Sequence, residues 1–212
     1  MKKHLLPVLL IAATAILWLV FYQQLPTQIP IHWNLNGVAD GYATKFNAML
    51  MNIGMMIILY VLLIFSPKLD PKRKNYQKFS RSYSMITIAI LFFLFLINAL
   101  VIFTGIGYDI PIGKIVPFIV GFLFIVLGNY MHSVKPNYFV GIRTPWTLSN
   151  DTVWKKTHRF GSRIFILAGF LFIISPFLPD SLVRIFMFPV IFLIIILPIV
   201  YSYWVYRRMD IE

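Results

Sequence analysis

Residues 137–163 read NYFVGIRTPWTLSNDTVWKKTHRFGSR, a polar, basic and aromatic stretch in a chain that is otherwise largely apolar. Gly141 opens a turn, and Pro145 disfavours the helical conformation at Thr144, so residues 141–146 are predicted to be non-helical. Pro136 ends the apolar segment that comes before. The stretch is therefore predicted to form a structured region between membrane-crossing segments, and we take it as the centre of function.

A helix is predicted to begin inside this stretch. Ser149 is a suitable N-cap, and Asp151 would lie in the first turn, where the helix dipole favours a negative charge. The helix is expected to continue to Gly161. One predicted face is aromatic and carries Trp154 and His158. Another face is basic and carries Lys155 and Arg159. Such a pattern is typical of an amphipathic helix that lies in the membrane interface.

The composition places the whole chain in a membrane. Its 212 residues are 59% apolar and only 12% charged, with a mean hydropathy of +0.80, which is too apolar for a soluble domain. The chain has no cysteine, which excludes a disulfide framework, a thiolate nucleophile and a sulfur-ligated metal. The formal net charge of +12 would suggest nucleic acid in a soluble protein. Here the basic residues lie in short segments between apolar spans, where they determine orientation.

Six apolar segments approach the roughly 20 residues that a helix needs to cross the hydrocarbon core. They cover approximately residues 5–22, 48–65, 84–105, 112–132, 164–177 and 182–206. The fifth is the shortest, and it either extends backward through Phe160 or pairs with the sixth as a tight hairpin through residues 179–181. A secretory signal peptide is the alternative for the first segment, but no small-residue cleavage site follows it.

The distribution of basic residues predicts the orientation. With six crossings, 16 of the 19 Lys and Arg residues lie on the side of the two termini, and only Lys45, Lys114 and Arg184 lie opposite. Short basic loops stay in the cytoplasm, so we predict that both termini are cytoplasmic. The predicted fold is an all-α integral membrane protein, a six-transmembrane-helix bundle. It has a small outer cap after helix 1 and an inner loop with an interfacial helix between helices 4 and 5.

Three regions follow from this layout. Residues 1–66 hold helix 1, the outer cap and helix 2. Residues 67–111 hold a basic inner loop, helix 3 and a short outer loop, and residues 112–212 hold helix 4, the inner stretch and helices 5 and 6. The basic inner loop, whose preceding helix is expected to end at Pro67 and Pro71, would lie against anionic headgroups, and a nucleic-acid patch is the disfavoured alternative.

The outer cap, residues 23–46, is too polar to cross the membrane. Prolines at 26 and 30 favour extended backbone, and the dipeptides Asn36-Gly37 and Asp40-Gly41 favour tight turns, so we expect a compact unit with short strands. His32 beside Trp33 allows a metal or catalytic role. The preferred alternative is that Trp33 and Tyr42 anchor at the interface while His32 satisfies a hydrogen bond within the cap.

The spans themselves contain essentially no ionisable residues, which disfavours a proton-coupled transporter or an ion pump. Asparagines at 52, 98 and 129 are the polar residues in the spans, and such residues usually hold helices together. Gly121 and Gly128, both in the fourth span, would allow close approach of another helix.

Two motifs resemble a known family. GIRTPWTLSNDTVWKKTHRFG, residues 141–161, is similar to the C-terminal signature of the SdpI-type immunity proteins, and IPIHWNLNGVADGYATK, residues 29–45, resembles the DUF1648 motif near their N-terminus. The order of the motifs, the length and the six-span layout also match, so the resemblance covers essentially the whole chain. It implies a bacterial cell-membrane protein that protects its producer from a secreted toxic peptide of the sporulation-delaying type. It also implies a signalling role, in which the protein holds a transcriptional repressor at the membrane.

The resemblance implies two sets of site residues. The outer cap would face the toxin, and its set is His32, Trp33, Asn34, Gly37, Asp40 and Lys45. The inner stretch would form a rigid platform for a cytosolic partner, and its set is Asn137, Gly141, Arg143, Thr144, Pro145, Trp146, Thr147, Trp154, Thr157, His158 and Arg159.

No catalytic residue, metal or cofactor is expected. His32 and His158 fall on opposite sides of the bilayer, and neither side offers a zinc spacing, a catalytic triad or a glycine-rich phosphate loop. The expected partners are a toxic peptide at the outer face, a cytosolic repressor and the lipid bilayer, without direct nucleic-acid contact. The competing functions are a small-molecule or lipid transporter with the inner loop as its gate, and a purely structural membrane subunit.

Overall fold

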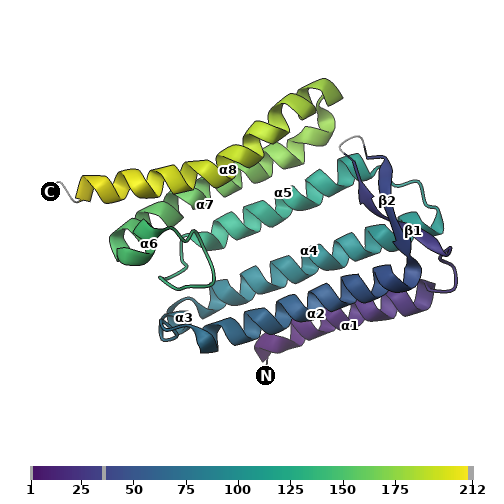
Figure 1. The fold of residues 1–212 in the computed structure, drawn as a ribbon, viewed down its shortest axis with the longest axis horizontal. Coiled ribbons are helices and arrows are strands. Elements are labelled where there is room, and N and C mark those ends of the chain that lie inside the picture. The colour runs from purple at the N-terminus through teal and green to yellow at the C-terminus, as the bar shows by residue number, and fades with distance from the viewer. Residues whose placement is uncertain (1, 35–36, 210–212) are drawn as a thin grey trace.

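Helices account for most of the computed structural model, which describes residues 2–34 and 37–209 (Figure 1). In chain order the elements are α1 (Lys2–Phe21), β1 (Gln28–Trp33), β2 (Ala39–Thr44), α2 (Lys45–Leu69), α3 (Asn75–Lys78), α4 (Ser80–Ile106), α5 (Ile112–Met131), α6 (Pro145–Ser149), α7 (Asp151–Ile174), the 3-10 turn η1 (Ser175–Phe177) and α8 (Asp180–Met209). Among the described residues, six helices are long and apolar enough to cross a membrane, which confirms the predicted class.

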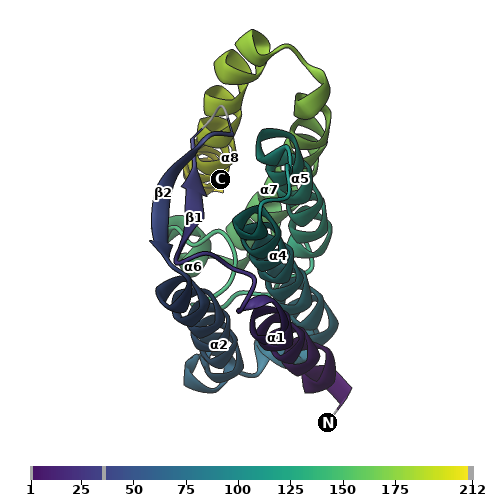
Figure 2. The same ribbon diagram turned by 90° about the vertical axis from the view of Figure 1, so that its right-hand side faces the viewer.

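The long helices lie side by side and define two ends of the molecule. β1 and β2 lie at one end, which we call the hairpin end (Figure 1). α3, α6 and the N and C labels lie at the other, which we call the α6 end (Figure 1). In the end view, α1, α2 and α4 form one group and α7 and α8 lie on the other side of α5 (Figure 2). Residues of the two predicted site sets are therefore at opposite ends of the bundle.

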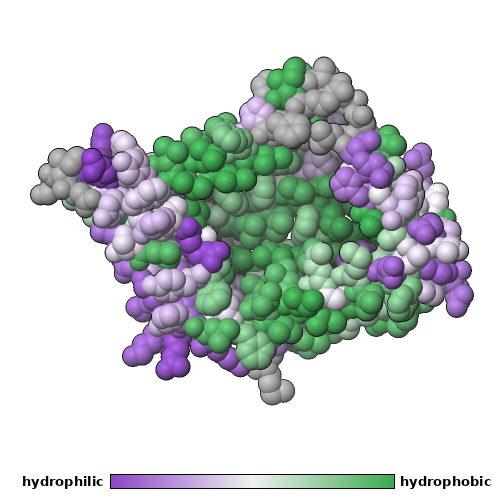
Figure 3. Space-filling model, in the orientation of Figure 1, coloured by the Kyte–Doolittle hydropathy of each residue, from purple (hydrophilic) through white to green (hydrophobic). Residues whose placement is uncertain are grey.

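Hydropathy follows the same axis. Hydrophobic side chains form a band along the middle of the molecule, and hydrophilic side chains gather at its two ends (Figure 3). Many large apolar side chains of the long helices are exposed, which is expected where the surrounding solvent is lipid. On the face shown, the band is hollowed between α8 and the α1, α2 and α4 group (Figure 3).

Small residues hold α5 and α7 together, as predicted for the two glycines of the fourth span. A Cβ atom added to Gly121 would lie 2.6 Å from the carbonyl oxygen of Gly169, and one added to Gly128 would lie 2.8 Å from that of Ser162. Ser162 donates a hydrogen bond of 2.7 Å to the Gly128 carbonyl. Close backbone approach of this kind is how helices associate in lipid, where no hydrophobic force drives them together.

The hairpin joins α1 to α2 and has short strands, as expected for the outer cap. β1 and β2 are antiparallel, with Gln28 opposite Thr44 and Trp33 opposite Ala39. The dipeptide Asp40-Gly41 lies within β2, so the prediction of a second turn there is wrong. Asn36, predicted to form a turn with Gly37, lies outside the described residues.

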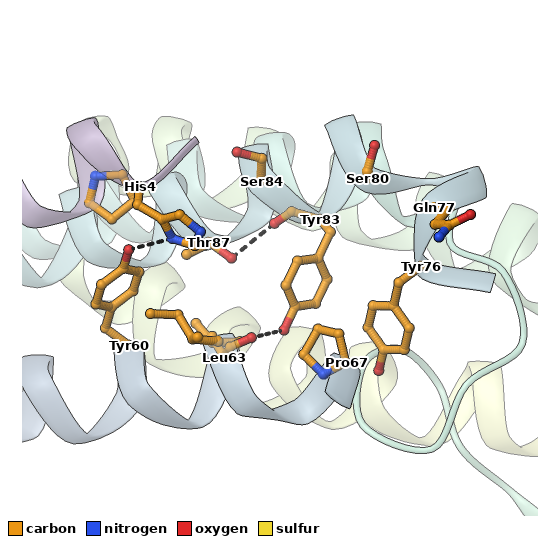
Figure 4. A pocket seen from close by; sticks show the side chains of 12 residues that line it. His4, Tyr60, Leu63, Pro67, Tyr76, Gln77, Ser80, Tyr83, Ser84 and Thr87 are labelled. Carbon is orange, nitrogen blue, oxygen red and sulfur yellow. Dashed lines mark hydrogen bonds between the residues drawn. The ribbon is translucent and has the colours of Figure 1, made fainter. Parts of the chain in front are cut away.

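Of the two prolines predicted to end α2, Pro71 follows the C-cap Asp70, whereas Pro67 lies inside the helix, which continues to Leu69. A proline inside a helix frees the carbonyl four residues earlier, because it has no N–H to donate. That carbonyl belongs to Leu63, and it accepts a hydrogen bond of 2.5 Å from the hydroxyl of Tyr83 on α4 (Figure 4). The proline is tolerated because a neighbouring helix supplies the missing donor.

The interfacial helix predicted for residues 151–161 is also wrong, because these residues form the first turns of α7, which continues to Ile174. Its N-cap is Asn150, not Ser149, and the Asn150 side chain accepts from the backbone N–H groups of Thr152 and Val153. Gly161 does not end the helix; it is buried, and an added Cβ would lie 2.4 Å from the Ile142 Cδ1 atom. Residues 141–144 are non-helical, as predicted, but Pro145 and Trp146 are not, because they begin a short helix, α6.

Candidate functional site

The inner stretch folds around the side chain of Asn137, which is fully buried. Its Oδ1 atom accepts hydrogen bonds from the backbone N–H groups of Phe139, at 2.9 Å, and Val140, at 2.7 Å. Its Nδ2 atom donates to the carbonyls of Lys135 and Val140. One amide side chain therefore fixes residues 135–140, which have no regular secondary structure of their own.

Asp70 connects this loop to the end of α2. Its carboxylate is buried and accepts from the backbone N–H of Tyr138, at 2.8 Å, and from the hydroxyl of Tyr76, at 3.0 Å. The same hydroxyl lies 3.2 Å from the Asn137 Oδ1 atom. Burial, followed by the hydrogen bond to Asp70, raises the pKa of Tyr76, so its hydroxyl stays protonated as a donor. Neither residue was among the predicted site residues, although Asp70 is a lone acid in a basic segment.

His158 connects the loop to α7. Its Nε2 atom accepts from the backbone N–H of Ile142, at 3.1 Å, and its Nδ1 atom contacts the carbonyl of Trp154, at 2.9 Å. These partners require a neutral imidazole with the proton on Nδ1. The ring is buried and stacks on the Trp154 indole, with the centroids 4.1 Å apart. His158 therefore acts as a structural link.

Gly141 passes directly over this imidazole. Its φ of +114° is in the left-handed region, as its predicted turn requires, and an added Cβ would lie 2.3 Å from the His158 Nε2 atom. The Trp154 Nε1 atom donates to the carbonyl of Val134, at 2.9 Å. Trp154 and His158 share a face, as predicted, but that face is buried in protein and does not lie in the membrane interface.

A capping box begins α6 and connects it to α8. The Thr144 hydroxyl accepts from the Thr147 backbone N–H, and the Thr147 hydroxyl accepts from the Thr144 N–H. The Thr144 hydroxyl also lies 3.0 Å from that of Ser202 on α8, and the Trp146 ring packs against Tyr203 with the centroids 5.0 Å apart. Sequence reasoning did not identify Ser202, because a serine within an apolar span carries no motif.

The remaining residues of the inner set differ in exposure. Arg143 is exposed, and its guanidinium donates to the carbonyl of Tyr138 at 2.6 Å. Arg159 and Pro145 are also exposed. Thr157 is buried, and its hydroxyl has no hydrogen-bond partner among the described residues. The inner set is therefore mostly a buried brace that joins the end of α2, the loop, α7 and α8, with two arginines on its surface.

At the hairpin end, His32 and Asp40 pair across the strands. The His32 Nδ1 atom lies 2.5 Å from the Asp40 carboxylate, and both side chains are largely exposed. This agrees with the expectation that His32 is satisfied within the cap. The Asn34 side chain accepts from the Val38 backbone N–H at 3.1 Å. Gly37 has a φ of +74° and lies so close to the start of α5 that an added Cβ would be 2.9 Å from the Gly113 nitrogen.

Lys45 has a structural position. Its ammonium donates to the carbonyls of Tyr22, at 3.1 Å, and Leu25, at 2.8 Å, just beyond the carboxyl end of α1. A cation is favourable there, because unpaired carbonyls carry the negative end of the helix dipole. Lys45 was predicted to face the toxin, and the structure does not bring its ammonium together with the His32 and Asp40 pair.

A cleft lies between the hairpin and the helices beneath it. Its volume is about 360 Å³, and its lining joins β1 to the adjoining ends of α4 and α5. The lining residues are Ile31, His32, Trp33, Asn34, Ile97, Leu100, Ile112, Gly113, Val116 and Pro117. We call this the hairpin cleft. Three predicted outer residues thus border an apolar cleft, which the sequence did not reveal because its floor comes from two distant helices.

A second cavity, of about 280 Å³, lies between α1, α2, α3 and α4 at the α6 end (Figure 4). The hydroxyl of Tyr60 lies 2.9 Å from the His4 Nδ1 atom at one side, and Tyr76 and Tyr83 extend toward Pro67 at the other (Figure 4). None of its residues belongs to either motif. No periodicity or spacing would have identified it, since it forms only where α1, α2, α3 and α4 meet.

Among the side chains that the structure describes, no three His, Asp or Glu residues gather so that they could hold a metal ion. His32 and His158 lie at opposite ends of the bundle, one on β1 and the other near the start of α7 (Figure 1).

Comparisons with known proteins agree with both motifs. Residues 133–202 match the SdpI/YfhL protein family, and residues 9–57 match a domain of unknown function, DUF1648. The chain is 28% identical over 210 residues to the immunity protein SdpI of Bacillus subtilis (strain 168), covering 99% of each protein. No solved structure matches. The resemblance inferred from the motifs is confirmed, and the chain is a multi-pass cell-membrane protein.

Proposed function

We propose that this chain, which resembles the SdpI-type immunity proteins over its whole length, protects its producer cell against a secreted toxic peptide. The likeness supports a membrane immunity function, since the curated relative is named as an immunity protein. We further propose that the toxin is an amphipathic or apolar peptide of the sporulation-delaying type. It would be met at the hairpin end, which the charge distribution predicts to be outside the cell.

The hairpin cleft is the observation that carries this proposal. Its floor is apolar, with Leu100, Ile112 and Val116, and its border holds the exposed His32 and Asp40 pair. An amphipathic segment presents an apolar side to such a floor and a polar side to such a border. The hollowed hydrophobic band beside it offers further apolar surface in the plane of the membrane (Figure 3).

The inner brace would have a supporting role. It connects α2, α7 and α8 through buried hydrogen bonds, including those of Asp70 and Thr144. We propose that toxin held at the hairpin end biases this brace, and that a cytosolic repressor docks near the exposed Arg143. An exposed guanidinium suits recognition of an acidic partner. This signalling step is separable from protection, because it needs the opposite end of the protein.

Protection can be tested in a toxin-sensitive strain that expresses the chain. Trp33→Ala removes the aromatic side chain that borders the cleft, and Val116→Trp places a larger apolar side chain in the cleft. Both are expected to lower the toxin concentration that stops growth toward that of cells without the protein. Survival is measured at protein levels matched by immunoblot of the membrane fraction.

Tyr42→Ala is the matched control. Tyr42 is an aromatic residue of the same hairpin, 60% exposed, that does not line the cleft. It is expected to leave protection unchanged. Full protection by both cleft variants at matched abundance would refute the role of the hairpin cleft.

A further inference from the structure

A basic pocket at the α6 end shares only Arg159 with the inner set of predicted site residues. It opens between the first turns of α7 and the last turns of α8, with a volume of about 670 Å³. Its basic lining consists of Lys155, Lys156, Arg159, Arg163 and Arg208. Lys155, Lys156 and Arg159 lie in the motif of residues 141–161, and Lys155 and Arg159 form its predicted basic face. We call this the α7–α8 pocket.

The positive charge of this pocket is not neutralised by the described part of the chain. Among the side chains that the structure describes, two ion pairs form, one between His32 and Asp40 and the other between Lys72 and Asp151. Neither involves a residue of the pocket. Lys155, Arg159 and Arg163 are spaced by four residues on α7, so they lie on one helix face and repel one another. A bound anion would relieve this repulsion.

Aromatic rings complete the pocket. Phe160 of α7 stacks on Tyr201 of α8 with the centroids 4.3 Å apart, which fixes the two helices relative to each other. The Arg208 guanidinium lies 3.8 Å from the centre of the Trp204 ring. Arg208 is therefore oriented by a cation–π contact, which leaves its N–H donors available to an anion.

The position of the pocket favours a lipid as the source of that anion. Trp204 and Tyr201 are the residue types that mark the level of the lipid headgroups. α7 continues from the pocket into the hydrophobic band, where Leu167 and Phe170 are exposed. A molecule with a phosphate and acyl chains could thus place the phosphate among the basic side chains and its chains along the helix.

We propose that the α7–α8 pocket binds the phosphate of an anionic phospholipid headgroup. The site is independent of the immunity function, because it lies at the opposite end of the bundle from the hairpin cleft. Occupancy would hold α7 against α8, to which the α6 brace is also attached through Ser202. Anionic lipid would therefore stabilise the half of the protein that contains the SdpI/YfhL region.

The test uses the purified full chain in nanodiscs of phosphatidylcholine with increasing phosphatidylglycerol, followed by thermal unfolding. Phosphatidylglycerol is expected to raise the midpoint of the wild-type protein in a saturable way. In Arg159→Gln/Arg163→Gln the apparent affinity for this lipid should fall roughly 30-fold, about fivefold for each basic residue removed near an anionic surface.

Lys74→Gln/Lys78→Gln is the control. It removes the same charge from exposed residues at the α6 end that do not line the pocket, and it should respond like the wild type. An equal loss of affinity in both variants would overturn the site, since it would indicate diffuse attraction to the surface. Soluble glycerol phosphate, added to the protein in neutral detergent, is expected to have no effect; stabilisation as large as that by phosphatidylglycerol would overturn the lipid assignment.

Native mass spectrometry of the wild-type protein keeps the proposal testable if the arginine variant fails to fold. With equal amounts of phosphatidylglycerol and phosphatidylcholine, the wild type should retain one molecule of phosphatidylglycerol in preference to phosphatidylcholine. Retention of both lipids without preference would contradict the proposal.

Discussion

Two features require glycine at position 141: a left-handed backbone conformation and the lack of space for a Cβ atom beside His158. A matched pair of variants distinguishes the two contributions. Both Gly141 and Gly107 have left-handed φ values, +114° and +110°, but only Gly141 has a neighbour where a Cβ would lie. Gly107→Ala should cost about 1–2 kcal/mol of stability for the strained backbone alone. Gly141→Ala should cost more than Gly107→Ala, because its methyl group would displace the His158 imidazole from its hydrogen bond with Ile142.

Thermal unfolding of both variants in the same detergent measures this difference. Equal losses would show that the contact between Gly141 and His158 contributes nothing beyond the backbone conformation. At this scale, most residues of the inner set contribute to the buried brace, whereas Arg143 and Arg159 lie on its surface.

The packing of α5 against α7 depends on glycine at the element scale, and Gly54 on α2 offers the comparison. A Cβ added to Gly121 would lie 2.6 Å from the Gly169 carbonyl oxygen, whereas one added to Gly54 would meet nothing within 4 Å. Gly54→Ala should be neutral or raise stability by up to about 1 kcal/mol, since alanine is the better helix former. Gly121→Ala should lower stability, because the two backbones must move apart.

The two glycine variants can be followed by resistance to unfolding in detergent at increasing temperature. A Gly121→Ala protein as stable as Gly54→Ala would mean that the close approach of α5 and α7 does not support the fold. Both variants should insert with normal abundance, since neither changes the hydrophobicity of its span.

The sequence predicted the elements better than their ends. Hydropathy located the long helices, because about 20 apolar residues are required wherever a helix crosses lipid. The prediction of helix ends failed at Pro67 and at Gly161, because proline and glycine are residues that commonly end a helix. In each case a distant side chain decides the outcome: Tyr83 bonds the carbonyl of Leu63, and Ile142 packs against Gly161. The hairpin cleft and the α7–α8 pocket were unpredictable for a related reason, since each is lined by residues far apart in sequence, which in the pocket are 152–163 and 201–209.

The molecule as a whole separates its two motifs by the length of the helices. The hairpin lies at one end, whereas α6, the start of α1 and the end of α8 lie toward the other (Figure 1). This arrangement agrees with an even number of crossings, and the excess of Lys and Arg predicts which end is cytoplasmic. The proposed division of labour, with toxin met at the hairpin end and a partner at the α6 end, depends on this separation.

The absence of cysteine makes the separation directly measurable, because a single introduced thiol has no native background. Tyr42→Cys in β2 and Ser149→Cys in α6 both replace exposed residues. In intact cells, a membrane-impermeant maleimide should label the cysteine at position 42, and should label that at 149 only after the membrane is permeabilised. Labelling of both positions in intact cells, or of position 149 alone, would contradict the proposed arrangement of the two motifs across the membrane.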